Sequence, residues 1–197
     1  MLAKFFAVLL LATTSVIASP FPLDKRGNII VRYRRASKTQ AADYNKHGAV
    51  TWDPTWKEHW GQQIGKGVYS CPTRDMYTLS TDQSWYCVLS VDEASFDKLD
   101  KAWIPRKDPS NKTLWNQNTE TNLDNYIKSL DSSWNPDTTI RLSIMPNGKD
   151  MSAIQMCIPP ALVEKVKFHA VCKEKKNEVK DDHVDYSKWK NVKGKKE

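Results

Sequence analysis

Short apolar runs bounded by polar residues recur along the chain, and most of them have the composition of β-strands. The clearest run, at 85–91, reads Trp-Tyr-Cys-Val-Leu-Ser-Val and is rich in the aromatic and β-branched residues that strands favour. Asn147-Gly148 is a dipeptide that favours a tight turn. The pattern predicts further strands at 28–32, 68–71, 138–145, 153–158 and 168–172.

Start and stop signals between these runs predict short helices. Ser37 can cap a helix that runs to His47, and Gly48 is suited to end it. The polar segment 107–122 shows no apolar period and is expected to be a long loop. Three other short helices are expected, at 92–99, 123–130 and 161–166. Because strands and helices mix without regular alternation, the chain is predicted to be α+β.

The first 26 residues have the organisation of an export signal. An early lysine precedes an apolar run at 5–11, which is too short to span a bilayer, and small residues follow. Lys25-Arg26 is the dibasic pair that a kexin-type protease cuts, and the whole layout resembles that of fungal secreted proteins. The sequence therefore predicts a signal peptide at 1–19, a pro-segment at 20–26, and an extracellular protein that begins at Gly27.

The chain that follows is long enough for one domain with a core, and it has no later apolar stretch that suits a membrane helix. Its last segment, 173–197, holds nine lysines, six acids and few apolar residues. Such a composition buries too little apolar surface to offset the entropy lost on ordering. We therefore expect a globular domain at 27–172 and a charged, disordered tail at 173–197. The acids among the lysines disfavour a nucleic-acid contact, so a solvated tail is the main expectation.

An even number of cysteines in an exported chain favours disulfides. Cys71, Cys87, Cys157 and Cys172 allow three pairings, with buried free thiols as the alternative. We predict Cys71–Cys87 and Cys157–Cys172, because each pair flanks a short stretch that could fold back locally. No two cysteines have the spacing of a structural zinc site.

The chain lacks the common catalytic signatures. It contains no serine-hydrolase elbow, no paired-histidine zinc motif and no Walker phosphate loop, and its histidines have no metal-like spacing. Asn111-Lys112-Thr113 is an acceptor for N-glycosylation, which indicates an exposed loop in a secreted glycoprotein.

Two short segments carry a more specific pattern. Tyr33-Arg34-Arg35-Ala36-Ser37 ends the first expected strand, and Gly65-Lys66-Gly67-Val68-Tyr69-Ser70 enters the second. This order resembles the ADP-ribosyltransferase family of secreted toxins, especially fungal proteins with the heat-labile enterotoxin A-like fold. Segments 87–91 and 155–160 are also similar to that group. The resemblance implies a single small α+β domain with a split antiparallel sheet and short helices.

The resemblance also assigns roles to residues. It implies that Arg34 holds the phosphate and ribose of NAD, a role that suits an always-charged guanidinium. Tyr69, or Ser70 beside it, would lie under the nicotinamide, and Gly65 and Gly67 would let the backbone approach the cofactor. Active members carry a glutamate that stabilises an oxocarbenium-like charge, often two residues after a Gln or Glu.

This chain departs from the family pattern at that last position. Gln155 is followed two residues later by Cys157, and no acid lies between Met151 and Ala161. A neutral amide cannot stabilise a developing cation as a carboxylate does. The resemblance therefore implies a degenerate catalytic set of Arg34, Tyr69 and Gln155.

The sequence consequently favours a secreted effector or virulence-type protein that is catalytically impaired and acts by binding a host protein. One alternative is an active transferase that uses NAD and completes its site with an acid elsewhere, for example Glu93 or Glu164. The other is a non-enzymatic cationic toxin or surface-binding module with a tryptophan-rich exterior. NAD is a cofactor only in the first alternative, and the sequence indicates no other cofactor, no metal and no oligomeric state.

Overall fold

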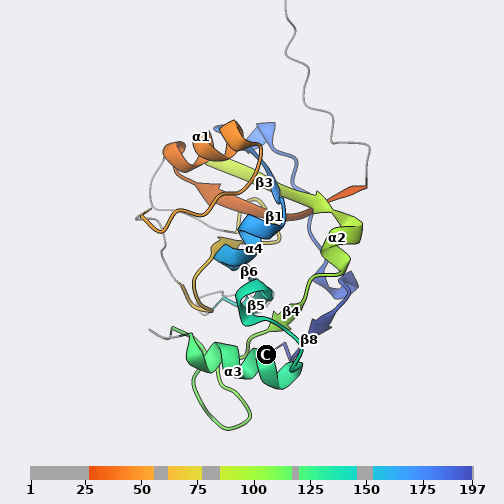
Figure 1. Cartoon of the computed structure of the whole chain (residues 1–197). Helices are drawn as coiled ribbons and strands as arrows, with labels where there is room; N and C mark the ends of the chain where they lie inside the picture. The colour runs from red at the N-terminus through yellow and green to blue at the C-terminus, as the bar shows by residue number, and fades with distance from the viewer. Residues whose placement is uncertain (1–26, 56–61, 77–84, 117–119, 146–152, 197) are drawn as a thin grey trace, which may run out of the picture.

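The computed structural model describes residues 27–55, 62–76, 85–116, 120–145 and 153–196. The expected signal peptide and pro-segment, and the expected turn at Asn147-Gly148, lie outside the described residues. Within them the chain forms a small α+β domain with two sheets and short helices, as the sequence predicts (Figure 1).

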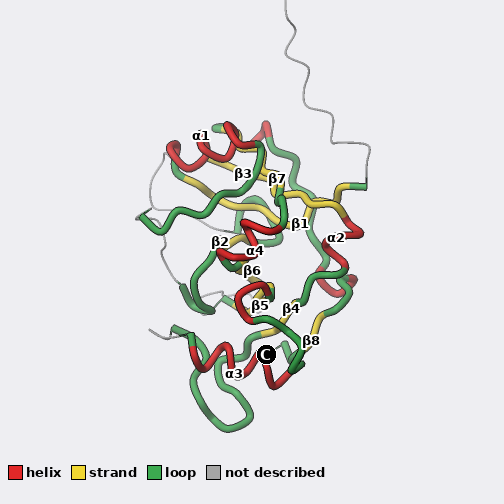
Figure 2. The backbone as a smooth tube through the Cα atoms, in the orientation of Figure 1, coloured by secondary structure: helices red, strands yellow, loops and turns green. Residues whose placement is uncertain are grey.

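The first sheet has three antiparallel strands in the order β1-β3-β7 (Figure 2). They are β1 (Asn28–Ala36), β3 (Trp85–Asp92) and β7 (His169–Lys173), all at positions where apolar runs predict strands. The first strand extends four residues beyond its predicted end at position 32, so Arg34 lies within β1.

The second sheet has five strands in the order β2-β6-β5-β4-β8. It is mixed, because β4 runs parallel to both of its neighbours, whereas β6 is antiparallel to β2 and β5. The expectation of a wholly antiparallel split sheet is therefore wrong for this half. The strands are β2 (Val68–Ser70), β4 (Lys101–Trp103), β5 (Ile140–Ile144), β6 (Ile154–Ile158) and β8 (Val192–Lys193).

Within the described ranges, four α-helices and three short 3-10 turns join the strands. Ser37 caps the first helix by accepting a hydrogen bond from Gln40 N at 3.2 Å, and Gly48 ends it with φ 60°, a left-handed conformation that favours glycine. The helices are α1 (Lys38–His47), α2 (Glu93–Asp97), α3 (Thr121–Leu130) and α4 (Pro160–Lys165). The turns are Pro136–Thr138, Lys176–Glu178 and Tyr186–Lys188.

Side chains of β6 alternate between two hydrophobic cores, as a strand buried on both faces requires. Met156 and Ile158 enter the inter-sheet core, which also contains Val31 and Leu89 of the first sheet. Cys157 enters the α3 core, which the second sheet forms with the apolar face of α3. The second sheet is therefore covered on both faces.

The residues after β7 are not a disordered tail, which corrects the expectation for 173–197. We call residues 174–196 the C-terminal segment; its Val179, Val184 and Tyr186 are buried against Tyr33 and Cys71, and β8 pairs with β4. A few well-spaced apolar residues anchor the segment, while its lysines are exposed. Average composition hides such anchors because the charged residues outnumber them.

Lys101 also holds the C-terminal segment in place, through a hydrogen bond to Lys190. Its ammonium donates hydrogen bonds to the carbonyl oxygens of Phe96 (2.7 Å), Leu99 (2.8 Å) and Lys190 (3.0 Å). Burial lowers the pKa of Lys101 to about 8, although Asp97 and Asp100 act in the opposite direction. One buried cation at the start of β4 thus bonds to the end of α2 and to Lys190, just before β8.

The disulfide pairing also differs from the prediction. Cys87 is bonded to Cys172, while Cys71 and Cys157 are buried and lie outside this disulfide. The reason is strand register: β3 pairs with β7 so that Cys87 lies directly opposite Cys172, 85 residues away in sequence. Local fold-back, on which the predicted pairs depended, does not occur, because Cys71 and Cys157 belong to the second-sheet region.

We expect removal of this cross-link by Cys87→Ala with Cys172→Ala to lower the free energy of unfolding by about 4 to 5 kcal/mol. A bond that closes so long a loop restricts the unfolded chain strongly in the chain-entropy model. Denaturant titration measures the loss, with Cys71→Ala as the single-thiol control. Non-reducing peptide maps should link Cys87 to Cys172; a link from either residue to Cys71 or Cys157 would contradict the structure.

Candidate functional site

Arg34 is half-buried and its guanidinium is bonded to the protein itself. Nη1 donates to the carbonyl oxygen of Tyr69 at 2.6 Å, while Nε and Nη2 donate to Oε1 of Gln40 at 3.3 and 3.0 Å. Arg34 therefore ties β1 to the edge strand β2 and to α1. All three guanidinium nitrogens make a bond within the fold, which accounts for the position of this arginine without a ligand.

Tyr69 presents its carbonyl to Arg34 but turns its ring into the α3 core. Its hydroxyl donates to Gly65 O at 2.7 Å and accepts from Ile64 N at 2.9 Å, and burial raises its pKa well above the ordinary value. Ser70 faces the other way, where its hydroxyl accepts from Nε of Arg32 at 3.2 Å. Neither side chain is presented to a ligand.

Gln155 lies in a closed polar cluster on the α3 side of the second sheet. Its Nε2 donates to Gln63 Oε1 at 2.6 Å and to Ser143 Oγ at 3.0 Å, and only 3% of the residue is exposed. Gln63 in turn donates to Ile144 O at 3.0 Å. These bonds use the amide nitrogen of Gln155 inside the protein.

The structure thus brings Arg34 and Tyr69 into contact but does not place them with Gln155 around one cleft. Arg34 reaches the outer edge of β2, whereas Gln155 projects from the sheet face that α3 covers. The alternative acids lie on other elements: Glu93 begins α2 and Glu164 lies on α4, and both are exposed.

The glycines of the predicted cofactor loop are required by packing. A Cβ on Gly67 would come within 2.4 Å of Ile158 O, and φ of 153° there disfavours any other residue. A Cβ on Gly65 would meet Nη1 of Arg141 at 1.9 Å. The close approach that the sequence assigned to a cofactor is made by the protein's own strand β6 and by Arg141.

Arg141, which is buried, and Glu120, which is partly exposed, form an ion pair that the sequence did not predict. Arg141 Nη2 lies 3.1 Å from Glu120 Oε2, its Nη1 donates to Ile64 O at 3.1 Å, and Glu120 Oε1 accepts from Lys66 N. Burial by itself would raise the pKa of Glu120, but Arg141 and the Lys66 N–H outweigh it and hold the pKa below the ordinary value. A charged residue inside the apolar run 140–144 was the available signal, since buried charges need partners.

A cavity lies elsewhere, between the C-terminal segment and the second sheet. Its volume is about 550 Å³. We call it the C-terminal pocket. Its walls come from the loop after β2, the end of β4, the start of β6 and residues 183–196. The lining residues are Pro72, Trp103, Ile154, His183, Val184, Asp185, Tyr186, Ser187, Trp189, Val192 and Lys196.

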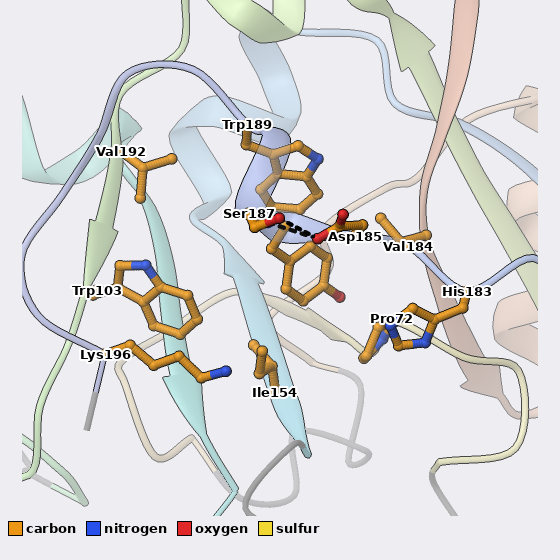
Figure 3. Close-up of a pocket in the computed structure, with 11 residues that line it drawn as sticks. Pro72, Trp103, Ile154, His183, Val184, Asp185, Ser187, Trp189, Val192 and Lys196 are labelled. Carbon is orange, nitrogen blue, oxygen red and sulfur yellow. Dashed lines mark hydrogen bonds between the residues drawn. The ribbon is translucent and has the colours of Figure 1, made fainter.

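Figure 3 shows how these walls are arranged. Trp103 and Trp189 present their indoles from different sides, with Ile154 below them. Lys196 extends beneath Trp103 with its ammonium directed toward Ile154. Mostly apolar walls with a few polar groups at the margin are typical of small-ligand sites. No residue of the predicted NAD site lines this pocket.

Other sequence-predicted features can be placed briefly. Asn111 lies in an exposed loop, with its Oδ1 accepting from Lys107 Nζ at 2.9 Å, so its surface position is as expected and its glycosylation stays a prediction. Within the described ranges, no group of three His, Cys, Asp or Glu side chains is placed to hold a metal ion. None of the helices that the structure describes is long and apolar enough to cross a membrane.

Comparison with known proteins assigns the chain to a family. It belongs to a family of unknown function, DUF5910, whose model matches residues 62–195. No curated protein and no solved structure matches the chain. The matched range includes the C-terminal segment up to Lys195 and every lining residue of the C-terminal pocket except Lys196, whereas Arg34 lies outside it.

We expect Glu120→Gln to lower the free energy of unfolding at neutral pH by roughly 3 kcal/mol, because it leaves the Arg141 cation buried without its anion. The folded-state pKa of Glu120 lies below the unfolded value of 4.5, so the contribution is present above 4.5 and is lost as the pH falls through the folded pKa. Denaturant titration against pH measures this. The exposed Glu93→Gln is the matched control, and equal effects of the two variants would contradict the ion-pair assignment.

Tyr186 gives a second stability prediction. The residue is 7% exposed, and its buried hydroxyl makes no hydrogen bond to any described residue. We expect Tyr186→Phe to leave stability unchanged or raise it by up to about 1 kcal/mol, because it removes an unsatisfied polar group. Tyr186→Ala should cost about 3 to 5 kcal/mol through the cavity it leaves. A large loss in the Phe variant, measured by thermal or chemical unfolding, would refute this reading of the hydroxyl.

Proposed function

We propose that the protein is a secreted effector that acts by binding a host target and does not transfer ADP-ribose. The observation that supports this proposal is the buried hydrogen bonding of Gln155 to the Gln63 amide and the Ser143 hydroxyl, neither of which is an acid. A reaction through an oxocarbenium-like transition state needs an anion near the developing charge. Gln155 offers none, and its own amide is bonded inside the fold.

The state of Arg34 and Tyr69 supports the same proposal. The Arg34 guanidinium is bonded to Tyr69 O and Gln40, and the Tyr69 ring is buried on the α3 side. For NAD to bind, these contacts would have to break before phosphate and nicotinamide could replace them. Each exchange would cost the hydrogen bonds already made.

Some features of the ADP-ribosyltransferase pattern are present, and they support the proposed resemblance to that family. Arg34 lies on β1, α1 follows and ends at Gly48, and the Gly65–Gly67 loop leads directly into β2. The domain also has two separate sheets. A transferase-like fold whose predicted site residues are bonded to the protein itself, with Gln155 in place of the acid, would account for both the resemblance and the proposed loss of catalysis. Fold similarity alone would not establish a function in any case.

Export and target binding have independent support. A disulfide between Cys87 and Cys172 persists in the oxidising compartments through which secreted proteins pass. The C-terminal pocket, rather than the Arg34 region, offers the concave surface that a binding protein needs. We assign target binding to this pocket.

We expect the protein that begins at Gly27 to release no nicotinamide from NAD above the uncatalysed rate, and calorimetric titration with NAD to give no binding heat. Arg34→Ala should lower stability by about 1 to 3 kcal/mol because it leaves Tyr69 O and Gln40 without their donor. An active toxin of the resembled family serves as the positive control.

Robust NAD hydrolysis by the wild-type protein would contradict the proposal. The variants Glu93→Gln and Glu164→Gln would then identify the acid: loss of turnover in one of them would establish the active-transferase alternative. Liposome leakage and cell-killing assays test the remaining alternative, a non-enzymatic cationic toxin, since membrane damage without a saturable target would favour it.

A further inference from the structure

The C-terminal pocket combines aromatic walls with an uneven distribution of charge. Trp103 and Trp189 supply two indoles, and Ile154 and Val192 supply aliphatic surface between them. Flat aromatic surfaces of this kind favour planar ligands, which stack on the rings or meet them edge to face. The walls alone do not distinguish a neutral ligand from a charged one.

The lysines at the end of the chain make that distinction. Residues 188–196 include five lysines and no acid. Three of these lysines are paired: Lys188 with Asp185 at 3.7 Å, Lys190 with Asp97 at 2.5 Å and Lys193 with Asp131 at 2.6 Å. Among the described residues, Lys195 and Lys196 have no ion-pair partner, and of these two only Lys196 lines the pocket.

The acid at the pocket margin does not cancel this charge. Asp185 accepts hydrogen bonds from Ser187 N at 3.0 Å and Ser187 Oγ at 2.6 Å, and it is the partner of Lys188. These interactions orient its carboxylate toward its own turn. Lys196 instead lies with its ammonium nitrogen 5.8 Å from the Trp103 ring centroid, beside the apolar floor (Figure 3).

We propose that the C-terminal pocket binds a small planar aromatic carboxylate, with the ring against Trp103 and Trp189 and the carboxylate at the Lys196 ammonium. The proposal rests on the proposed binding function and names the ligand class of that same site. Apolar walls lower the local dielectric constant, so a charge pair formed at their edge is stronger than the same pair in water. The ring supplies apolar contact and the charge supplies selectivity.

The test uses three ligands with one ring system and different charges: 2-naphthoate, 2-naphthamide and 2-naphthylmethylammonium. Calorimetric titration of the protein that begins at Gly27 should give 2-naphthoate an affinity about 3- to 10-fold higher than that of the amide, with the cation weakest. Acetate, which carries the charge without the ring, should give no measurable binding. Raising the salt concentration to 1 M should remove the advantage of the anion and leave the amide unaffected.

Two matched variants separate Lys196 from the general positive charge of the segment. Lys196→Gln should bring the affinity for 2-naphthoate down to that for 2-naphthamide, while the affinity for the amide stays unchanged. Lys195→Gln removes the same charge one residue away and should alter neither affinity. Both lysines are exposed, so we expect the two variants and the wild type to have equal unfolding midpoints, which would confirm that folding is preserved.

Three results would overturn the proposal: no binding of 2-naphthoate, equal affinities for all three ligands, or equal losses in the two lysine variants. The last would indicate diffuse attraction by the C-terminal lysines. These outcomes do not depend on NAD, so NAD turnover would reject the proposed binding function while leaving the charge preference of the pocket as a separate result.

Discussion

Arg32 is the residue that joins the three parts of this domain. It is fully buried on β1, and it donates to Ser70 O at 2.8 Å and to Ser70 Oγ at 3.2 Å on β2. Its guanidinium carbon also lies 4.4 Å from the ring centroid of Tyr186. A single cation therefore connects the first sheet, the second sheet and the C-terminal segment. Stacking on an aromatic ring and donating to a carbonyl are both well suited to a planar guanidinium.

The aromatic residues above Arg32 extend this connection into the pocket. Tyr186 and Trp189 have ring centroids 4.3 Å apart, and Trp189 meets Phe96 of α2 edge-on at 4.9 Å. Tyr186 and Trp189 are at the same time walls of the C-terminal pocket. The contacts that order the C-terminal segment thus also shape the cavity, so the pocket exists only when the segment is docked.

Much of the local structure could be predicted from the sequence, because its causes are local. The strand at 85–91, the cap at Ser37 and the stop at Gly48 depend on the residues themselves and their immediate neighbours. The predictions that were wrong all concerned contacts between residues far apart in the sequence. The Cys87–Cys172 bond follows from strand register, and the parallel pairing of β4 with β5 and β8 follows from connections that apolar periodicity does not encode.

The candidate site shows the same division. The family resemblance assigned Arg34, Gly65 and Gly67 to an NAD site, and the structure gives each a specific contact inside the fold. The resemblance could not tell a contact with a ligand from a contact with the protein, because the same residue types serve both. The pocket went unnoticed because its walls come from segments far apart in the chain, including one that composition had marked as disordered.

Magnetic resonance of the isotope-labelled protein tests most directly where this molecule binds its ligands. Spectra recorded with 2-naphthoate should show shifts of the Trp103 and Trp189 indole N–H signals and of the Ile154 and Val192 methyl signals. Spectra recorded with NAD should remain unchanged. Shifts with NAD at the backbone amides of Arg34, Gly65 and Gly67, with the pocket signals unmoved by 2-naphthoate, would contradict a binding protein that works through its C-terminal pocket.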